Sequence, residues 1–80
     1  MTRPAIAVVG PWTGLRVYDA DDTSRPILHI DACAVRVLEK WALDALQEDE
    51  IRIERDGVVY AVPAGRDLAR VILTALWQRG

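Results

Sequence analysis

The sequence predicts a single α+β domain over residues 1–80, with a mainly antiparallel sheet of about five strands and two helices in the order β-β-β-α-β-β-α. Three features predict this class: short runs that alternate apolar and polar residues, an Asp-Gly pair between two such runs, and two longer segments with apolar residues every three or four positions. Eighty residues leave room for one hydrophobic core, and 51% hydrophobic with 28% charged residues is a globular balance.

The first part of the chain predicts three strands. Residues 5–9 are apolar at every position, as in a strand that is covered on both faces or paired centrally, and Gly10-Pro11 ends them with turn chemistry. Residues 15–18 alternate with period two. After a polar loop, residues 27–30 form a short apolar run that can return antiparallel to the second strand.

A helix is predicted from about residue 32 to residue 48. Asp31 stands just before it, where a carboxylate can accept the amide hydrogens of the first turn, so we expect Asp31 to be the N-cap. The acids at 48–50 are disfavoured at a helix C-terminus and indicate the end of the helix. The expected buried stripe is Ala34, Val35, Leu38, Trp41, Ala42, Ala45 and Leu46.

A hairpin is the clearest local prediction. Two alternating runs, residues 51–55 and 58–62, flank Asp56-Gly57, a pair typical of a type I′ turn. That turn sets the register, in which Arg55 pairs with Val58, Ile53 with Tyr60 and Ile51 with Val62.

A second helix is predicted from residue 66 to about residue 78, after the break at 63–65. Its expected buried residues are Leu68, Val71, Ile72, Ala75 and Leu76. We expect both helices to lie on one side of the sheet, which makes one α+β unit.

Both helices carry more apolar residues than one buried stripe needs. Cys33, Val37 and Trp41 follow the spacing i, i+4, i+8, and Ala69, Leu73 and Trp77 repeat it, while Trp12 adds a third tryptophan in a turn. Wide apolar patches on a soluble chain indicate an interface, where tryptophan is enriched. The competing interpretation is that each helix packs against two neighbours. We favour an interface, either of a homodimer or with a larger protein.

The charge balance disfavours nucleic acid as a partner. Lys+Arg 10 against Asp+Glu 12 gives a net charge of -2 and a sequence pI of about 5.2, so the molecule as a whole does not attract phosphate. The alternative hypothesis is a nucleic-acid-binding regulator with a local patch of Arg52, Arg55, Arg66 and Arg70. Glu54 and Asp67 are interspersed among these residues, which favours an ordinary solvated face.

The residues predict no enzyme, cofactor or metal. Asp19, Asp21 and Asp22 with His29 match no known metal loop and are typical of a solvated turn. Cys33 near a helix start could be a thiolate, but a nucleophile needs a base and an oxyanion site, and His29 is the sole histidine. The glycines at 10 and 14 lack the Lys-Ser/Thr pair of a phosphate loop.

The expected location is the cytoplasm. A single cysteine, Cys33, forms no internal disulfide, and small exported domains usually need such links. The apolar runs fall far short of the about 20 residues that span a bilayer, and we expect neither a membrane segment nor a signal peptide.

Residues 5–43 resemble a known family. The residues that carry the resemblance are Ala5-Ile6-Ala7-Val8, Gly14-Leu15-Arg16-Val17-Tyr18-Asp19, Asp22, Pro26-Ile27-Leu28-His29-Ile30 and the helix after Asp31. They look like a small actinobacterial domain of unknown function that is often encoded beside helix-turn-helix regulators. The resemblance implies a regulatory partner protein. Tyr18-Asp19-Ala20-Asp21 stands where that family has Arg-Asp-Ser-Lys, and Val35 stands where it has an aromatic residue.

Together these features predict a non-enzymatic protein-protein interaction module, regulatory or inhibitory, that docks on a larger protein through its apolar helix stripes. A phage-encoded accessory protein that inhibits a host machine has the same size and character.

Overall fold

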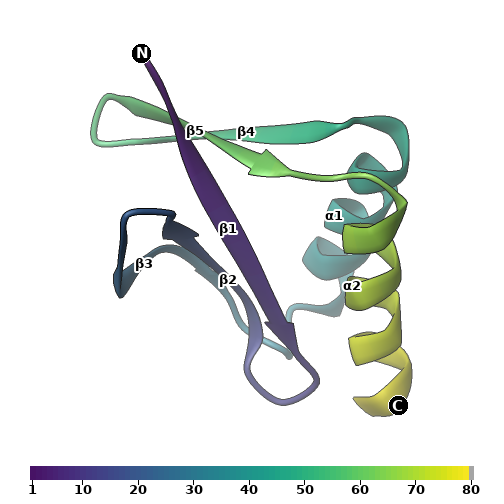
Figure 1. Cartoon of the computed structure of the whole chain (residues 1–80). Coiled ribbons are helices and arrows are strands. Elements are labelled where there is room, and N and C mark those ends of the chain that lie inside the picture. The colour runs from purple at the N-terminus through teal and green to yellow at the C-terminus, as the bar shows by residue number, and fades with distance from the viewer. Residues whose placement is uncertain (80) are drawn as a thin grey trace.

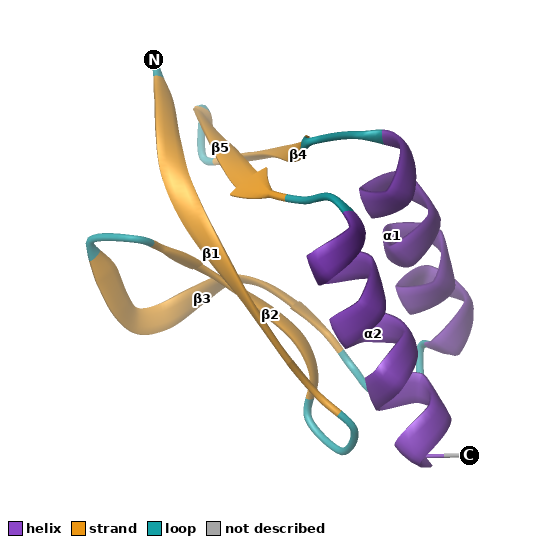
Figure 2. Cartoon of the chain, turned by 45° about the vertical axis from the view of Figure 1, so that its right-hand side comes forward, coloured by secondary structure: helices purple, strands orange, loops and turns teal. Residues whose placement is uncertain are grey.

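The computed structural model describes residues 1–79 and has the predicted order of elements (Figure 1). The elements are β1 (Thr2–Gly10), β2 (Gly14–Asp19), β3 (Asp22–Ile30), α1 (Val35–Gln47), β4 (Glu50–Arg55), β5 (Val58–Pro63) and α2 (Arg66–Arg79). Both helices lie together on one side of the sheet, as expected (Figure 2).

The sheet has five strands in the order β3-β2-β1-β5-β4 and is mixed. Three neighbouring pairs are antiparallel, but β1 and β5 are parallel, through residues 2–4 of β1 and 59–61 of β5. The rest of β1 pairs with β2, so β1 joins the β2–β3 hairpin to the β4–β5 hairpin (Figure 1). The expectation of a mainly antiparallel sheet therefore holds only in part, because no local pattern reports a pairing between chain segments so far apart.

The β4–β5 hairpin has the predicted register. Arg55 pairs with Val58, Ile53 with Tyr60 and Ile51 with Val62. Asp56 and Gly57 both have positive φ, at 52° and 79°, which is what a type I′ turn requires of its two central residues.

The β2–β3 hairpin and strand β1 are longer than the sequence predicts. β1 begins at Thr2 and β3 at Asp22, so most of the expected polar loop is extended chain and only a tight turn after Asp19 remains. Asp19 holds that turn, since its Oδ1 accepts the backbone N–H of Asp21 at 2.9 Å. Polar residues can occupy these strand ends because their side chains remain exposed to water.

The start of α1 differs from the prediction. Asp31 is not the N-cap: that position is Ala34, which has no side-chain capping bond, and the helix begins at Val35. The Asp31 carboxylate instead accepts the backbone N–H of Cys33 at 2.8 Å, and its carbonyl accepts the N–H of Ala34 at 2.9 Å. These bonds form a turn that precedes the helix. The C-cap, Glu48, lies where the acidic run indicated.

The core lies between the sheet and the two helices. Its buried members are Ala5, Leu15, Val17, Ile30, Leu38, Ala42, Val62 and Ile72, of which Leu15, Val17, Val62 and Ile72 are fully buried. Strand alternation sends every second side chain of β1 to the other face, which no helix covers, so that Ile6 and Val8 are exposed there.

The helices are antiparallel neighbours. The backbone N–H of Ala64 donates to the carbonyl of Asp49 at 2.8 Å, which ties the segment after α1 to the segment before α2. The end of α1 therefore lies beside the start of α2 (Figures 1 and 2).

This pairing corrects three members of the expected buried stripes. Val35 and Leu46 of α1 and Val71 of α2 are exposed. In contrast, Ala69 of α2, which was predicted to lie with Leu73 and Trp77 outside the buried stripe, is buried. Each helix shares its apolar arc between the sheet and the other helix, which rotates the buried face away from the one that the sequence predicts. Within residues 1–79, neither helix is long and apolar enough to cross a membrane.

Candidate protein interface

An open groove of about 490 Å³ lies on the outer side of the helix pair. It is lined by Leu46 of α1 and by Arg66, Ala69, Arg70, Leu73, Thr74 and Trp77 of α2. Ala69 is buried, and its small side chain leaves space between the larger side chains on either side. We call this surface the helix groove. Its lining is mainly apolar, with two guanidinium groups on α2.

The apolar side chains of the helix groove are displayed to solvent. Trp77 is 85% exposed, Leu46 52% and Leu73 47%. Leu43, 58% exposed, precedes Leu46 by three residues and so lies on the adjoining surface of α1. Large apolar side chains gathered on one surface indicate a site that a second molecule covers.

The other predicted stripe does not reach this groove. Cys33 lies in the turn before α1 and is exposed, Val37 is exposed, and Trp41 is half-buried against the core. None of the three lines the helix groove. Trp12 is 76% exposed in the turn between β1 and β2 and is also outside it. The structure therefore brings together Ala69, Leu73 and Trp77 but separates them from the remaining predicted interface residues.

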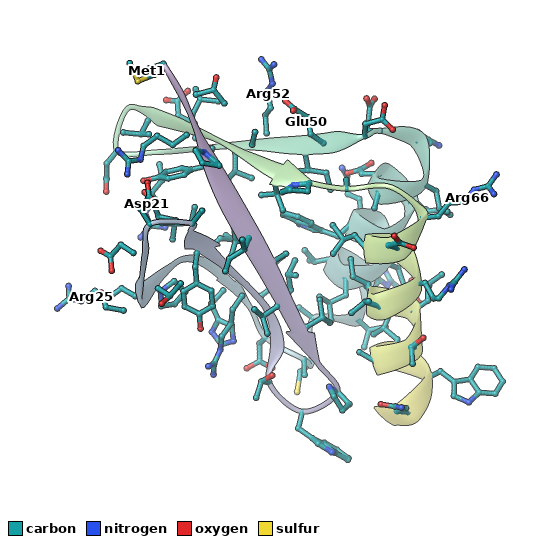
Figure 3. All side chains as sticks on the ribbon, in the orientation of Figure 1. Met1, Asp21, Arg25, Glu50, Arg52 and Arg66 are labelled. Carbon is teal, nitrogen blue, oxygen red and sulfur yellow. The ribbon has the colours of Figure 1, made fainter. Side chains whose placement is uncertain are left out.

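The four arginines of the alternative hypothesis do not form one patch. Arg52 Nε donates to Glu50 Oε2 at 2.8 Å and lies in a hollow with Asp44, Glu48 and Asp49. Figure 3 shows Arg52 above the sheet and Arg66 at the outer side of α2.

Arg55, another member of this set, turns toward β3. Its Nη1 donates to the carbonyl of Ile27 at 3.1 Å. Only Arg66 and Arg70 share a surface, and it is the helix groove.

The aspartate loop and His29 have structural partners. Arg3 Nε donates to Asp19 Oδ2 at 2.9 Å. The Asp21 backbone N–H and then Arg3 hold the pKa of Asp19 below its ordinary value. Asp22 accepts the hydroxyl of Ser24 at 2.6 Å.

The imidazole of His29 contacts the β1–β2 turn. Its Nε2 lies 2.9 Å from the carbonyl oxygen of Thr13 and must be the protonated nitrogen, since a carbonyl only accepts. Among residues 1–79, no three His, Cys, Asp or Glu side chains are grouped so as to hold a metal ion.

The apolar spacing of α1 does not predict that Leu46 lines the groove. It assigned Leu46 to the core and left Leu43 without a role. It also passed over Arg36 and Lys40. The sequence does carry a signal for the surface beside the groove, because Arg36, Lys40 and Leu43, none of which lines the groove itself, have the spacing i, i+4, i+7 of Arg66, Arg70 and Leu73.

Comparisons with protein-family models, with curated proteins and with solved structures found no match to this chain. The resemblance of residues 5–43 to the actinobacterial domain therefore stays a prediction.

Proposed function

We propose that this chain is a non-enzymatic protein-interaction module, regulatory or inhibitory, that docks on a larger protein through the helix groove. One observation carries the proposal: Leu46, Leu73 and Trp77 line a single open groove while remaining about half to mostly exposed. An 80-residue domain is marginally stable. A large apolar side chain left outside a small core contributes little to that stability, whereas the same side chain can dominate the energy of an interface.

The open face of the sheet fits docking less well. Its exposed apolar residues on β1 are Ile6 and Val8, and register places Tyr18 beside Ile6 and Arg16 beside Val8. Tyr18 and Arg16 are both half-buried there, which divides the apolar surface. Val8 is 53% exposed, close to the exposure of Leu73, and therefore offers a matched control position.

Affinity capture from a lysate of the source cell, followed by cross-linking, tests the proposal. Three baits are compared: the wild-type chain, Leu73→Glu and Val8→Glu. We expect a protein that is captured by the wild-type chain and by Val8→Glu and is lost with Leu73→Glu. Equal capture by all three baits would place the binding surface elsewhere. A chain that is monomeric in light scattering and captures nothing would contradict the proposal.

A further inference from the structure

The two helices carry the same surface pattern on their outer sides. In α1 the stripe is Arg36, Lys40, Leu43 and Gln47, and in α2 it is Arg66, Arg70, Leu73 and Trp77. Both follow the spacing i, i+4, i+7, i+11, which keeps all four residues of a stripe on one side of a helix. Each helix therefore has two cations in its first half and two uncharged side chains in its second half.

Antiparallel packing converts these stripes into a diagonal pattern. The apolar end of α1, Leu43 and Leu46, lies beside the start of α2, and the apolar end of α2, Leu73 and Trp77, lies beside the start of α1. An apolar band thus crosses the helix pair from one corner to the opposite corner.

The cations occupy the two remaining corners. Arg66 and Arg70 lie on one side of the apolar band, and Arg36 and Lys40 lie on the other. All four side chains are exposed. On the same surface, Glu39 of α1 is an exposed carboxylate, and Asp44 pairs with Lys40 at 3.2 Å. Asp67 of α2 is also exposed beside Arg66. The four cations outnumber these three carboxylates, so the outer surface of the helix pair has a small positive excess, although the chain has a net charge of -2.

Helix stability explains Lys40, which pairs with Asp44 four residues on, but not the three arginines. Positive charge is favourable at the C-terminal end of a helix, not the N-terminal end. Here Arg66 is the first residue of α2 and Arg36 the second residue of α1. Cations four residues apart also repel each other by a few tenths of a kcal/mol. Within residues 1–79, Arg36, Arg66 and Arg70 form no ion pair. Their positions are suited to a negatively charged ligand.

We infer that the helix groove binds an amphipathic α-helix of the partner, with an apolar face and Asp or Glu residues along both of its edges. The inference rests on the docking role proposed above and specifies the chemistry of the partner. The α2 residues that line the groove run from Arg66 to Trp77, about 16 Å of helix. A partner helix of roughly three turns would cover them. Its apolar side chains would lie along the band, and its carboxylates would lie beside the cations at both corners.

Charge favours this occupant over the alternatives. A second copy of this chain would present the same excess of cations on this surface, so the two surfaces would carry charge of the same sign. A nucleic acid would pair with the cations but leave Leu43, Leu46 and Leu73 without apolar contacts, and the net charge of -2 repels it. An acidic amphipathic helix satisfies both the band and the corners.

Selection from a displayed peptide library tests the inference. The library consists of helical peptides of about 16 residues with a fixed leucine face and with flanking positions that vary among Glu, Lys, Gln and Ser. The full chain is the bait. We expect selection of peptides with Glu on both flanks, and affinity that falls as salt is raised.

Charge reversal supplies the matched control. Arg66→Glu with Arg70→Glu should weaken binding of the selected peptide at least about fivefold and shift the selection toward Lys. Arg25→Glu with Arg55→Glu makes the same change in net charge on β3 and at the end of β4, where Arg55 contacts the carbonyl of Ile27, away from both helices. This control pair should leave the affinity unchanged.

Selection of Lys-flanked or uncharged helices by the wild-type chain would overturn the inference and leave the proposed function intact. Tighter binding to a DNA duplex or to anionic lipid vesicles, weakened by the Arg66 and Arg70 variants, would also overturn it, as would a dimer broken by Leu73→Glu. If no peptide is selected, the helical partner is excluded. The capture experiment with the Leu73 and Val8 variants then decides the proposed function separately.

Discussion

Ile72 and Leu73 are adjacent in α2 and have opposite surroundings, so truncating each to alanine separates folding from docking. Ile72 is 0% exposed within the core, and Leu73 is 47% exposed in the helix groove. Removing a buried Ile side chain costs the transfer free energy and leaves a cavity, together about 2–5 kcal/mol. A domain of 80 residues has about 4–12 kcal/mol of unfolding free energy in total.

Leu73→Ala should cost much less. The three carbon atoms that this truncation removes correspond to about 2 kcal/mol if fully buried. About half of the side chain is already in water and the groove is open, so that no closed cavity forms. We therefore expect a loss of about 1 kcal/mol. For partner binding the order reverses, because truncating a central interface residue typically costs more than 1 kcal/mol.

Urea denaturation followed by circular dichroism measures the first quantity, and fluorescence anisotropy of a labelled acidic helix measures the second. Ile72→Ala should lower the unfolding free energy by at least twice as much as Leu73→Ala and bind the helix normally while folded. If Leu73→Ala destabilises the fold as much as Ile72→Ala does, Leu73 is a core residue. The assignment of the groove as a docking surface would then be wrong.

Three further predictions concern the frame that holds the helices. Gly14→Ala should destabilise the domain by about 2–5 kcal/mol, because Gly14 has φ 84° and an added Cβ would clash with the backbone at residues 30–32. Gly57 has a similar φ of 79°, but an added Cβ there would meet no other atom. Gly57→Ala should therefore cost only about 1–2 kcal/mol. Equal losses in urea denaturation would refute this contrast. The pKa of Asp19 in the folded chain is depressed, so the carboxylate's contribution to stability is present above pH 3.8 and is lost as pH falls through the lower folded pKa. The stability difference between the wild-type chain and Asp19→Asn should therefore shrink in acid. A difference that stays constant with pH would contradict the contacts of Asp19 with Arg3 and Asp21. Arg52→Ala breaks an exposed ion pair with Glu50 and should change the unfolding free energy by less than about 1 kcal/mol; a larger loss in thermal unfolding would show a role that this geometry does not explain.

The sequence predicts the local structure of this chain better than its long-range pairing. The Asp56-Gly57 turn fixes the β4–β5 register through two positive φ angles, a property of two adjacent residues. The end of α1 at Glu48 follows from an equally local run of acids. In contrast, the parallel pairing of β1 with β5 joins residues nearly sixty positions apart, and nothing in either strand specifies its partner.

The candidate site was predicted only in part, because its two sides come from two helices whose packing the local sequence does not specify. Spacing identified Leu73 and Trp77 as surplus to one buried stripe, and both are exposed. It assigned Leu46 to the core because periodicity gives the apolar side of a helix without showing how that side is shared between a sheet and a second helix. Cys33, Val37 and Trp41 repeat the spacing of the stripe on α2, but none of them lines the groove. The rotation of each helix about its own axis decides which of its apolar residues face the groove, and that rotation is set by tertiary packing.

The central claim is that Leu43, Leu46, Leu73 and Trp77 lie in water in the isolated chain and are the surface that a partner covers. NMR titration of the labelled chain with the selected acidic helix tests it most directly. We predict chemical-shift changes at residues 66–77 and at the C-terminal half of α1, with the Trp77 indole among the largest. Changes confined to Ile6 and Val8 on the open face of the sheet would contradict the claim.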